Sequence, residues 1–222
     1  MRVATRLTAA AVLLVLACVA HAGLRSPQVV VSGTALQNFF TAQGQAINVN
    51  SDQLDQQTFS APFTTAFSVQ TMLGTGNVGT YNAGAVSPAL YLVDAGSSPA
   101  GWFATASYRT SPQRLAVNLF DNTSAFVGST TYLSGPPDPT SFGFYGQDAN
   151  TSFSQDARNT AGARVLAFAG TGARSGSTWL AIETSPTPGG DYADVVALVG
   201  LAPAAPVPAT TTTWSRVKRL FQ

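Results

Sequence analysis

The chain of 222 residues contains one cysteine, one histidine and one glutamate, and each scarcity restricts its chemistry. Cys18 and His21 both lie within the first 22 residues, so the remaining 200 residues have neither a thiol nor an imidazole. That part of the chain cannot form a disulfide, a Ser-His-Asp or Cys-His catalytic group, or an ordinary zinc site. If it is exported, its stability must come from its apolar core, which a domain of this size can supply.

Charge is also scarce, since charged residues make up 9% of the chain. Without residues 1–22, nine basic residues remain against ten acidic ones, and three of the basic ones (Arg216, Lys218 and Arg219) crowd the C-terminal end. Phosphate binding needs a basic face, so nucleic acid is not expected as a partner. Ser, Thr, Gly, Ala, Asn and Gln take the place of charge, which is typical of bacterial surface and matrix proteins.

No apolar run is long enough to span a bilayer comfortably. The N-terminal one runs from Leu7 to Val19, follows Arg2 and Arg6, and precedes a small-x-small sequence that ends at Ala22. We therefore expect residues 1–22 to be a signal peptide that directs the protein to the periplasm, the cell surface or the medium of a bacterium. The alternatives are an uncleaved anchor helix and a lipoprotein acylated on Cys18.

The body of the chain reads as short strands separated by Gly, Pro, Asn and Asp turns. In one of them Leu115, Val117 and Leu119 share a face, and Ala116, Asn118 and Phe120 share the other. The expected strands are Gln28–Ser32, Ala46–Asn50, Phe63–Leu73, Ala89–Val93, Trp102–Tyr108, Arg114–Leu119, Ala125–Val127, Ser141–Tyr145, Arg164–Phe168, Thr178–Ile182 and Asp194–Leu201.

One helix is expected, from Thr34 to Gln43, with Thr34 as its cap and Leu36, Phe39 and Phe40 on one face. Together these elements predict an all-β fold over residues 23–201. We expect an antiparallel, jelly-roll-like β-sandwich with one short N-terminal helix.

Residues 202–222 have a different composition. A Pro- and Thr-rich stretch, expected to be a stiff linker, leads into a short basic and aromatic tail that includes Trp214, Val217 and Phe221. The tail is either a frayed end or a short address read by export or surface-attachment machinery. It has no hydrophobic span, so the mature chain is expected to have no transmembrane segment.

Three carboxylates gather near the last two strands: Glu183, Asp191 and Asp194. Oxygen ligands at the end of a loop suit a hard cation such as Ca²⁺, and extracellular calcium modules bind at only about 10⁻⁴–10⁻³ M. We therefore predict that these residues converge and form a weak Ca²⁺ site. The alternative is that the aspartates cap turns by accepting backbone N–H bonds and that Glu183 sits at a strand edge.

The same region carries a resemblance, through Trp179-Leu-Ala-Ile-Glu183 and Asp191-Tyr-Ala-Asp194-Val-Val. Further matches are Leu36-Gln-Asn-Phe-Phe, Ile47-Asn-Val-Asn-Ser-Asp-Gln-Leu54, Val78-Gly-Thr-Tyr-Asn82, Phe142-Gly-Phe-Tyr145, Phe153-Ser-Gln-Asp-Ala-Arg-Asn159 and Val165-Leu-Ala-Phe168. The chain resembles domain-of-unknown-function family 4114, secreted bacterial β-rich domains common in proteins with PEP-CTERM-type sorting signals. The resemblance implies the fold, the compartment and a cation at the acidic loop, although Thr184, Gly189 and Ala193 replace acidic or amide residues of the family pattern.

The leading function is a non-enzymatic component of the cell surface or extracellular matrix. A carbohydrate-binding module is the first alternative, with Tyr91, Trp102, Tyr108 and Phe142-Gly-Phe-Tyr145 as an aromatic platform. Aromatic residues that alternate along strands more often belong to a core, which is the competing interpretation. A glycoside hydrolase that uses two carboxylates is the remaining alternative.

Overall fold

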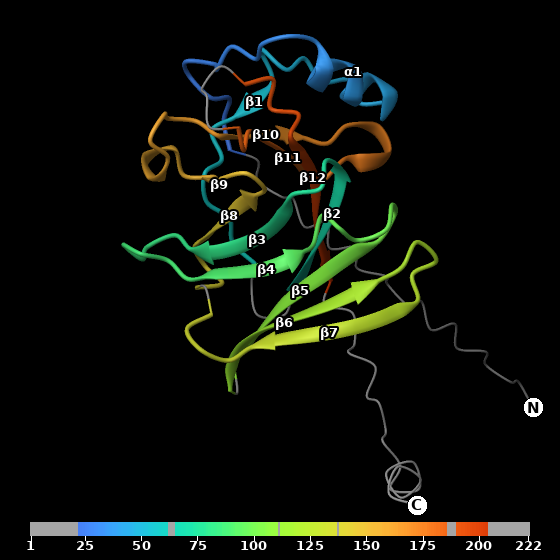
Figure 1. Cartoon of the computed structure of the whole chain (residues 1–222), viewed down its shortest axis with the longest axis vertical. Helices are drawn as coiled ribbons and strands as arrows, with labels where there is room; N and C mark the ends of the chain where they lie inside the picture. The colour runs from blue at the N-terminus through green and yellow to red at the C-terminus, as the bar shows by residue number, and fades with distance from the viewer. Residues whose placement is uncertain (1–21, 62–64, 111, 137, 186–189, 204–222) are drawn as a thin grey trace, which may run out of the picture.

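The structure is a computed structural model that describes residues 22–61, 65–110, 112–136, 138–185 and 190–203 (Figure 1). The prediction of an all-β sandwich with one short helix is confirmed. The elements are α1 (Ala35–Ala42), β1 (Gln53–Leu54), β2 (Thr65–Leu73), β3 (Asn77–Asn82), β4 (Leu90–Asp94), β5 (Phe103–Thr110), β6 (Gln113–Phe120), β7 (Phe126–Tyr132), β8 (Phe142–Gln147), β9 (Thr151–Phe153), β10 (Val165–Ala169), β11 (Ser177–Ile182) and β12 (Val195–Pro203).

The strands form two antiparallel sheets. An eight-stranded sheet has the order β1-β10-β11-β12-β2-β5-β6-β7, and a four-stranded sheet has the order β4-β3-β8-β9. The chain passes from the large sheet to the small one and back twice, so strands distant in sequence become neighbours. The clearest case is β12, the last strand, which pairs with β2 near the start of the domain.

An aromatic cluster fills the space between the sheets. Phe67 of the large sheet stacks on Phe142 of the small sheet, with ring centroids 5.3 Å apart, and meets Phe144 edge-on at 5.7 Å. Tyr108 completes the group, with its centroid 5.6 Å from that of Phe142. All four side chains are fully buried. Burial of this much apolar area is the main force that holds the two sheets together.

A second core lies on the opposite face of the large sheet. There α1 and the segment before it pack over β10, β11 and β12, near the top of Figure 1. Phe40 of α1 contacts Phe168 and Trp179 edge-on, with centroid distances of 5.2 and 5.7 Å. Alternating residues of the same strands thus enter different cores: Trp179 faces the helix, and Leu180 faces the small sheet. The continuous apolar runs of β10 and β12 reflect this burial on both faces.

Two of the expected strands, Gln28–Ser32 and Ala46–Asn50, are not strands. Side chains, rather than a neighbouring backbone, satisfy their amides. The Val29 amide donates to the Gln53 side-chain oxygen at 2.8 Å, and the Val31 amide donates to that of Asn50 at 2.8 Å. Gln53 is fully buried and also donates to the Val29 carbonyl at 2.6 Å. The Ile47–Leu54 motif is therefore a turn that leads into β1, and its side chains hold the N-terminal segment in place.

The other differences concern ends and short strands. The pattern of apolar residues did not indicate β1, β3 or β9, and β12 continues to Pro203, past the expected boundary at 201. Thr34 precedes α1, but its side chain makes no capping hydrogen bond. Of the expected helix face, Leu36 and Phe40 are buried, and Phe39 packs at the edge of the same core. In the described part of the chain, no helix is long and apolar enough to cross a membrane. The predicted signal peptide lies, except for Ala22, outside the described residues, as does the tail after Pro203.

Candidate functional site

The acidic motif lies where β11 ends and β12 begins. Ile182 pairs with Val195 in these antiparallel strands, so Glu183 and Asp194, one residue beyond each, are brought together. A hydrogen bond joins their carboxyl groups. The strand order thus produces the predicted convergence for two of the three carboxylates.

The side chain of Asp194 caps the turn that follows β11. Its Oδ2 atom accepts hydrogen bonds from the Thr184 amide at 2.8 Å and the Ser185 amide at 2.9 Å. The Thr184 hydroxyl donates to the same oxygen at 3.2 Å. Thr184, which replaces an acidic residue of the family pattern, therefore serves as a hydrogen-bond donor to the carboxylate.

Glu183 is only 3% exposed, which is unusual for a glutamate. Its carboxyl accepts the Ser185 amide at 3.0 Å and the backbone amide of Tyr192. The backbone of Gly190 passes directly over this carboxyl, and a Cβ there would lie 1.6 Å from Glu183 Oε2. Only glycine permits so close an approach, so Gly190 and Glu183 are matched to each other.

Burial sets the protonation of this pair. Burial, with smaller contributions from the hydrogen bond to Asp194 and from its negative charge, raises the pKa of Glu183 from 4.5 to about 7. Burial also acts to raise the pKa of Asp194. There, however, hydrogen bonds from Glu183 and from the Thr184 and Ser185 amides prevail, and the pKa falls below its usual 3.8. Below pH 7 the shared proton therefore resides on Glu183, which donates it to the Asp194 carboxylate.

Asp191 does not share the hydrogen bonds of Glu183 and Asp194 but caps a turn of its own. Its Oδ1 atom accepts the Ala193 amide at 3.0 Å, which is an Asx turn. Within the described residues, which include all three carboxylates, no group of three or more Asp, Glu, His or Cys side chains is arranged to hold a metal ion. These contacts are those expected for the capping interpretation, and Ca²⁺ binding stays a prediction.

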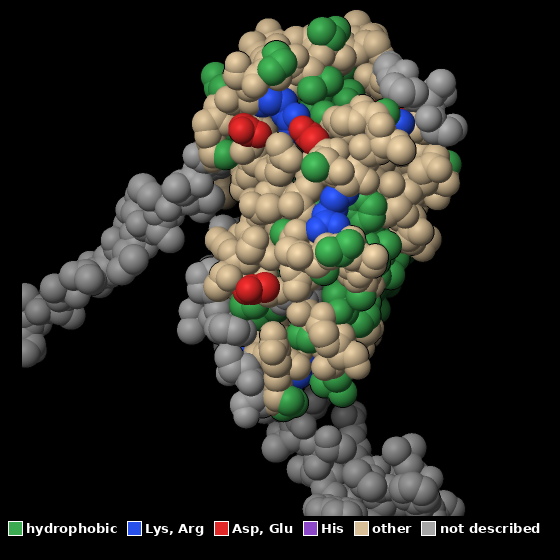
Figure 2. Space-filling view, turned by 90° about the vertical axis from the view of Figure 1, so that its left-hand side faces the viewer, with side chains coloured by type: hydrophobic (Ala, Val, Ile, Leu, Met, Phe, Trp, Pro, Cys, Tyr) green, Lys and Arg blue, Asp and Glu red, His purple; other side chains and the backbone are tan. Residues whose placement is uncertain are grey.

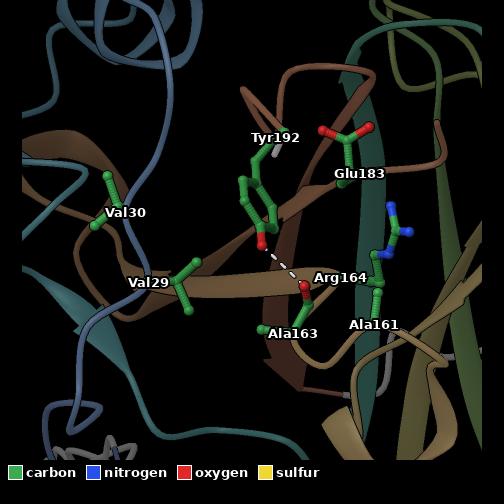
Figure 3. Close-up of a pocket in the computed structure, with 8 residues that line it drawn as sticks. Val29, Val30, Ala161, Ala163, Arg164, Glu183 and Tyr192 are labelled. Carbon is green, nitrogen blue, oxygen red and sulfur yellow. Dashed lines mark hydrogen bonds between the residues drawn. The ribbon is translucent and has the colours of Figure 1, made fainter. Parts of the chain in front are cut away.

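A cavity of about 300 Å³ adjoins the buried carboxyl (Figure 3). Val29 and Val30 form one wall, and Glu183 and Arg164 lie on the other side, with Tyr192 between them. The Tyr192 hydroxyl donates to the Ala163 carbonyl at 2.8 Å. Ala161, Ala163 and Gly190 also line the cavity.

Arg164 was not expected to belong to this site. The Glu183 amide donates to the Arg164 carbonyl at 2.9 Å, so the pairing of β10 with β11 places the two residues side by side. Arg164 Nη1 in turn donates to the Ser185 carbonyl at 2.7 Å. Its place follows from strand register, which the sequence pattern does not specify.

The aromatic residues named for the carbohydrate-binding alternative do not form a platform. Tyr91, Tyr108, Phe142 and Tyr145 are all buried, and only Trp102 is part-exposed. The Tyr91 hydroxyl donates to the carbonyls of Ser134 and Gly135, which follow β7. These residues belong to the core and its edge, as the competing interpretation held, and they offer no stacking surface for a sugar.

Comparisons of the chain with models of protein families, with curated proteins and with solved structures found no match. The resemblance to domain-of-unknown-function family 4114 therefore rests on the quoted motifs alone.

Proposed function

We propose that the protein is an exported, non-enzymatic component of a bacterial cell surface or extracellular matrix. The observation that supports this most is that the carboxyl groups of Glu183 and Asp194 are used in hydrogen bonds within their own loop. The donors that hold Glu183 and Asp194 belong to the same loop, so the carboxyls stabilise the fold and are not held ready for a substrate. Two apolar cores stabilise the domain without disulfides.

The surface composition supports the same role. Charged side chains are sparse on the face in view in Figure 2, and uncharged polar groups and backbone make up most of it. The N-terminal segment has the pattern of a signal peptide, and the Pro- and Thr-rich stretch with its basic tail fits attachment or sorting. Surface polysaccharide and sorting machinery are the partners that this proposal implies.

The geometry does not favour the glycoside hydrolase. Such enzymes place two carboxyl groups on either side of the scissile bond, about 5–10 Å apart. Glu183 and Asp194 instead hydrogen-bond directly to each other, which leaves no space for a glycosidic oxygen between them. The proton on Glu183 is held within the loop.

Export is tested by expression of the full chain in a Gram-negative bacterium, followed by fractionation and mass spectrometry. We expect a mature protein that begins at Gly23 and is found outside the cytoplasm. Leu13→Arg should block export by breaking the apolar run, whereas Leu13→Val should not. Retention of the unprocessed chain in the cytoplasm, or normal export of the Leu13→Arg variant, would overturn the proposal.

A further inference from the structure

Two arginines lie directly opposite each other on neighbouring strands of the large sheet. Arg109, near the end of β5, is paired with Arg114, near the start of β6, in the antiparallel register. Side chains at opposite positions of such a pair have Cβ atoms about 4.5–5.5 Å apart. The two strands lie near the bottom of Figure 1. Both arginines are part-exposed, so solvent reaches them.

The pair lies on the face of the large sheet that is turned away from the small sheet. Tyr108 precedes Arg109 and Leu115 follows Arg114, and both of these neighbours belong to the core between the sheets. Successive side chains of a strand point to opposite faces, so the two arginines point away from that core. They are therefore neighbours on one surface and not on opposite sides of the sheet.

No carboxylate neutralises the pair. In the described part of the chain, neither guanidinium is engaged in an ion pair or a hydrogen bond. Strands β2, β5, β6, β7 and β12 contain no Asp or Glu, and Asp121 lies at the other end of β6 from Arg114. The charge of Asp138 acts on Tyr108, on the core side. Its carboxylate accepts the amide and the hydroxyl of Thr140, at 2.8 and 2.7 Å.

The other arginines of the described chain are in different situations. Arg25 forms an ion pair with Asp156. Arg158 and Arg164 both donate to backbone carbonyls, and they therefore help to hold the fold. Arg174 is exposed, and it belongs to a short 3-10 helix with no arginine in strand register beside it. Only Arg109 and Arg114 combine an unneutralised charge with a second cation directly opposite.

This arrangement opposes folding and favours an anion. Like charges directly opposite each other destabilise a pair of strands, and a negative charge placed between them offsets the repulsion. A guanidinium keeps its charge at every accessible pH and presents its N–H donors as a planar fork. The fork fits two oxygens of a carboxylate, a sulfate or a phosphate group. Two adjacent forks provide donors for one such group from both sides.

We infer that Arg109 and Arg114 bind an oxyanion with the chemistry of a carboxylate, sulfate or phosphate group. The same group occurs in free anions and in acidic polymers, and the experiment separates these two sources. Acidic residues outnumber basic ones in residues 23–201, so a dense polyanion such as nucleic acid is not the expected source. The inference goes beyond export and surface location and does not depend on them.

The test is an NMR titration of the purified protein that follows the arginine Nε–Hε signals. Phosphate, sulfate and citrate are the free anions, alginate is the acidic polymer, and sodium chloride at equal ionic strength corrects for screening. We expect the signals of Arg109 and Arg114 to shift and saturate, and that of Arg174 to follow ionic strength alone. Saturation by a free anion identifies a site for small anions. Saturation by alginate alone identifies a site for a group on a polymer.

Variants separate a binding site from general charge attraction. Arg114→Gln should weaken the binding at least about tenfold, which corresponds to the loss of one charge-assisted hydrogen bond. Arg114→Lys keeps the charge but lacks the fork, so it should bind more weakly than the native protein and more tightly than Arg114→Gln. Arg174→Gln is the matched control, which removes one charge elsewhere and should bind like the native protein. Thermal melts should show that each variant is folded.

Four results would overturn the inference. They are the absence of a saturating shift with all four anions, an equal shift of the Arg174 signal, and unchanged binding in Arg114→Gln. The fourth is a shift that depends on the concentration of the protein and not on that of the anion. It would mean that the arginines contact a second copy of the chain.

Discussion

Substitution of Glu183 by glutamine should remove a pH-dependent weakness of the fold. The carboxyl is buried, shares a hydrogen bond with Asp194 and accepts the Ser185 amide at 3.0 Å. An amide of the same shape can accept the same N–H bond and can donate to Asp194 at every pH. It never has to lose a proton inside the loop, as the native side chain must when the pH rises.

The sign follows from the direction of the pKa change. Because the folded protein holds the Glu183 proton more tightly than the unfolded chain, the native fold loses stability as the pH rises from 4.5 to about 7. The full difference corresponds to about 3 kcal/mol, at about 1.4 kcal/mol per pKa unit. The lowered pKa of Asp194 gives stability that is lost only as the pH falls through the acid range, so it does not offset this loss.

Thermal unfolding at pH 5 and pH 8 measures the effect. A loss of about 3 kcal/mol in a domain of this size lowers the melting temperature by about 6–12 °C. We expect most of this fall in the native protein and little of it in Glu183→Gln, so the variant should be the more stable of the two at pH 8. Asp148→Asn, at an exposed carboxylate, is the control. Equal pH dependence in Glu183→Gln and the native protein would refute the reasoning.

Three further predictions concern the loop and its surroundings. Gly190→Ala should destabilise the fold by several kcal/mol, because the new Cβ would overlap Glu183 Oε2. The same substitution should cost far less free energy of unfolding in a Glu183→Ala background. Gly128→Ala is the control and should be nearly neutral, since no atom lies within 4 Å of its Cβ. Ca²⁺ bound at the acidic loop must displace the shared proton, so millimolar Ca²⁺ should raise the melting temperature at pH 8 and not at pH 5, and Asp194→Asn should abolish the rise. No rise at either pH would leave the carboxylates as capping groups. Arg158→Lys should lower stability by about 1–2 kcal/mol in denaturant unfolding, because lysine cannot reproduce the hydrogen bonds of Nη2 to the Ala83 and Ala85 carbonyls, and unchanged stability would contradict this.

The sequence was sufficient for strands whose burial alternates. In β6, Leu115 and Val117 enter the core between the sheets while Ala116 and Asn118 face away, as period-two alternation predicts. The short apolar runs also located the end of β11 at Ile182 and the start of β12 to within one residue, and the pairing of these strands brings Glu183 to Asp194.

The same reasoning failed where side chains replace a neighbouring strand. Residues 28–32 look like a strand because they are apolar and extended, but Gln53 and Asn50 supply the acceptors that another backbone would provide. Nothing in the sequence indicates that the Gln53 side chain will be buried against the backbone of Val29. Only the tertiary structure shows that Gln53 is fully buried and accounts for its hydrogen bonds.

Alternation also cannot tell which face of a strand will be covered, and this decides where a binding surface can lie. Phe67 and Phe103 both occur in alternating strands, yet one is fully buried between the sheets and the other lies on the open face. The difference arises because the large sheet has eight strands and the small sheet and α1 each cover only part of it. A search for exposed aromatics by sequence pattern therefore selected Tyr91 and Tyr108, which are core residues. The strand register instead aligns Phe103, Phe120 and Phe126 on three successive strands, on the face of the large sheet that is turned away from the small sheet.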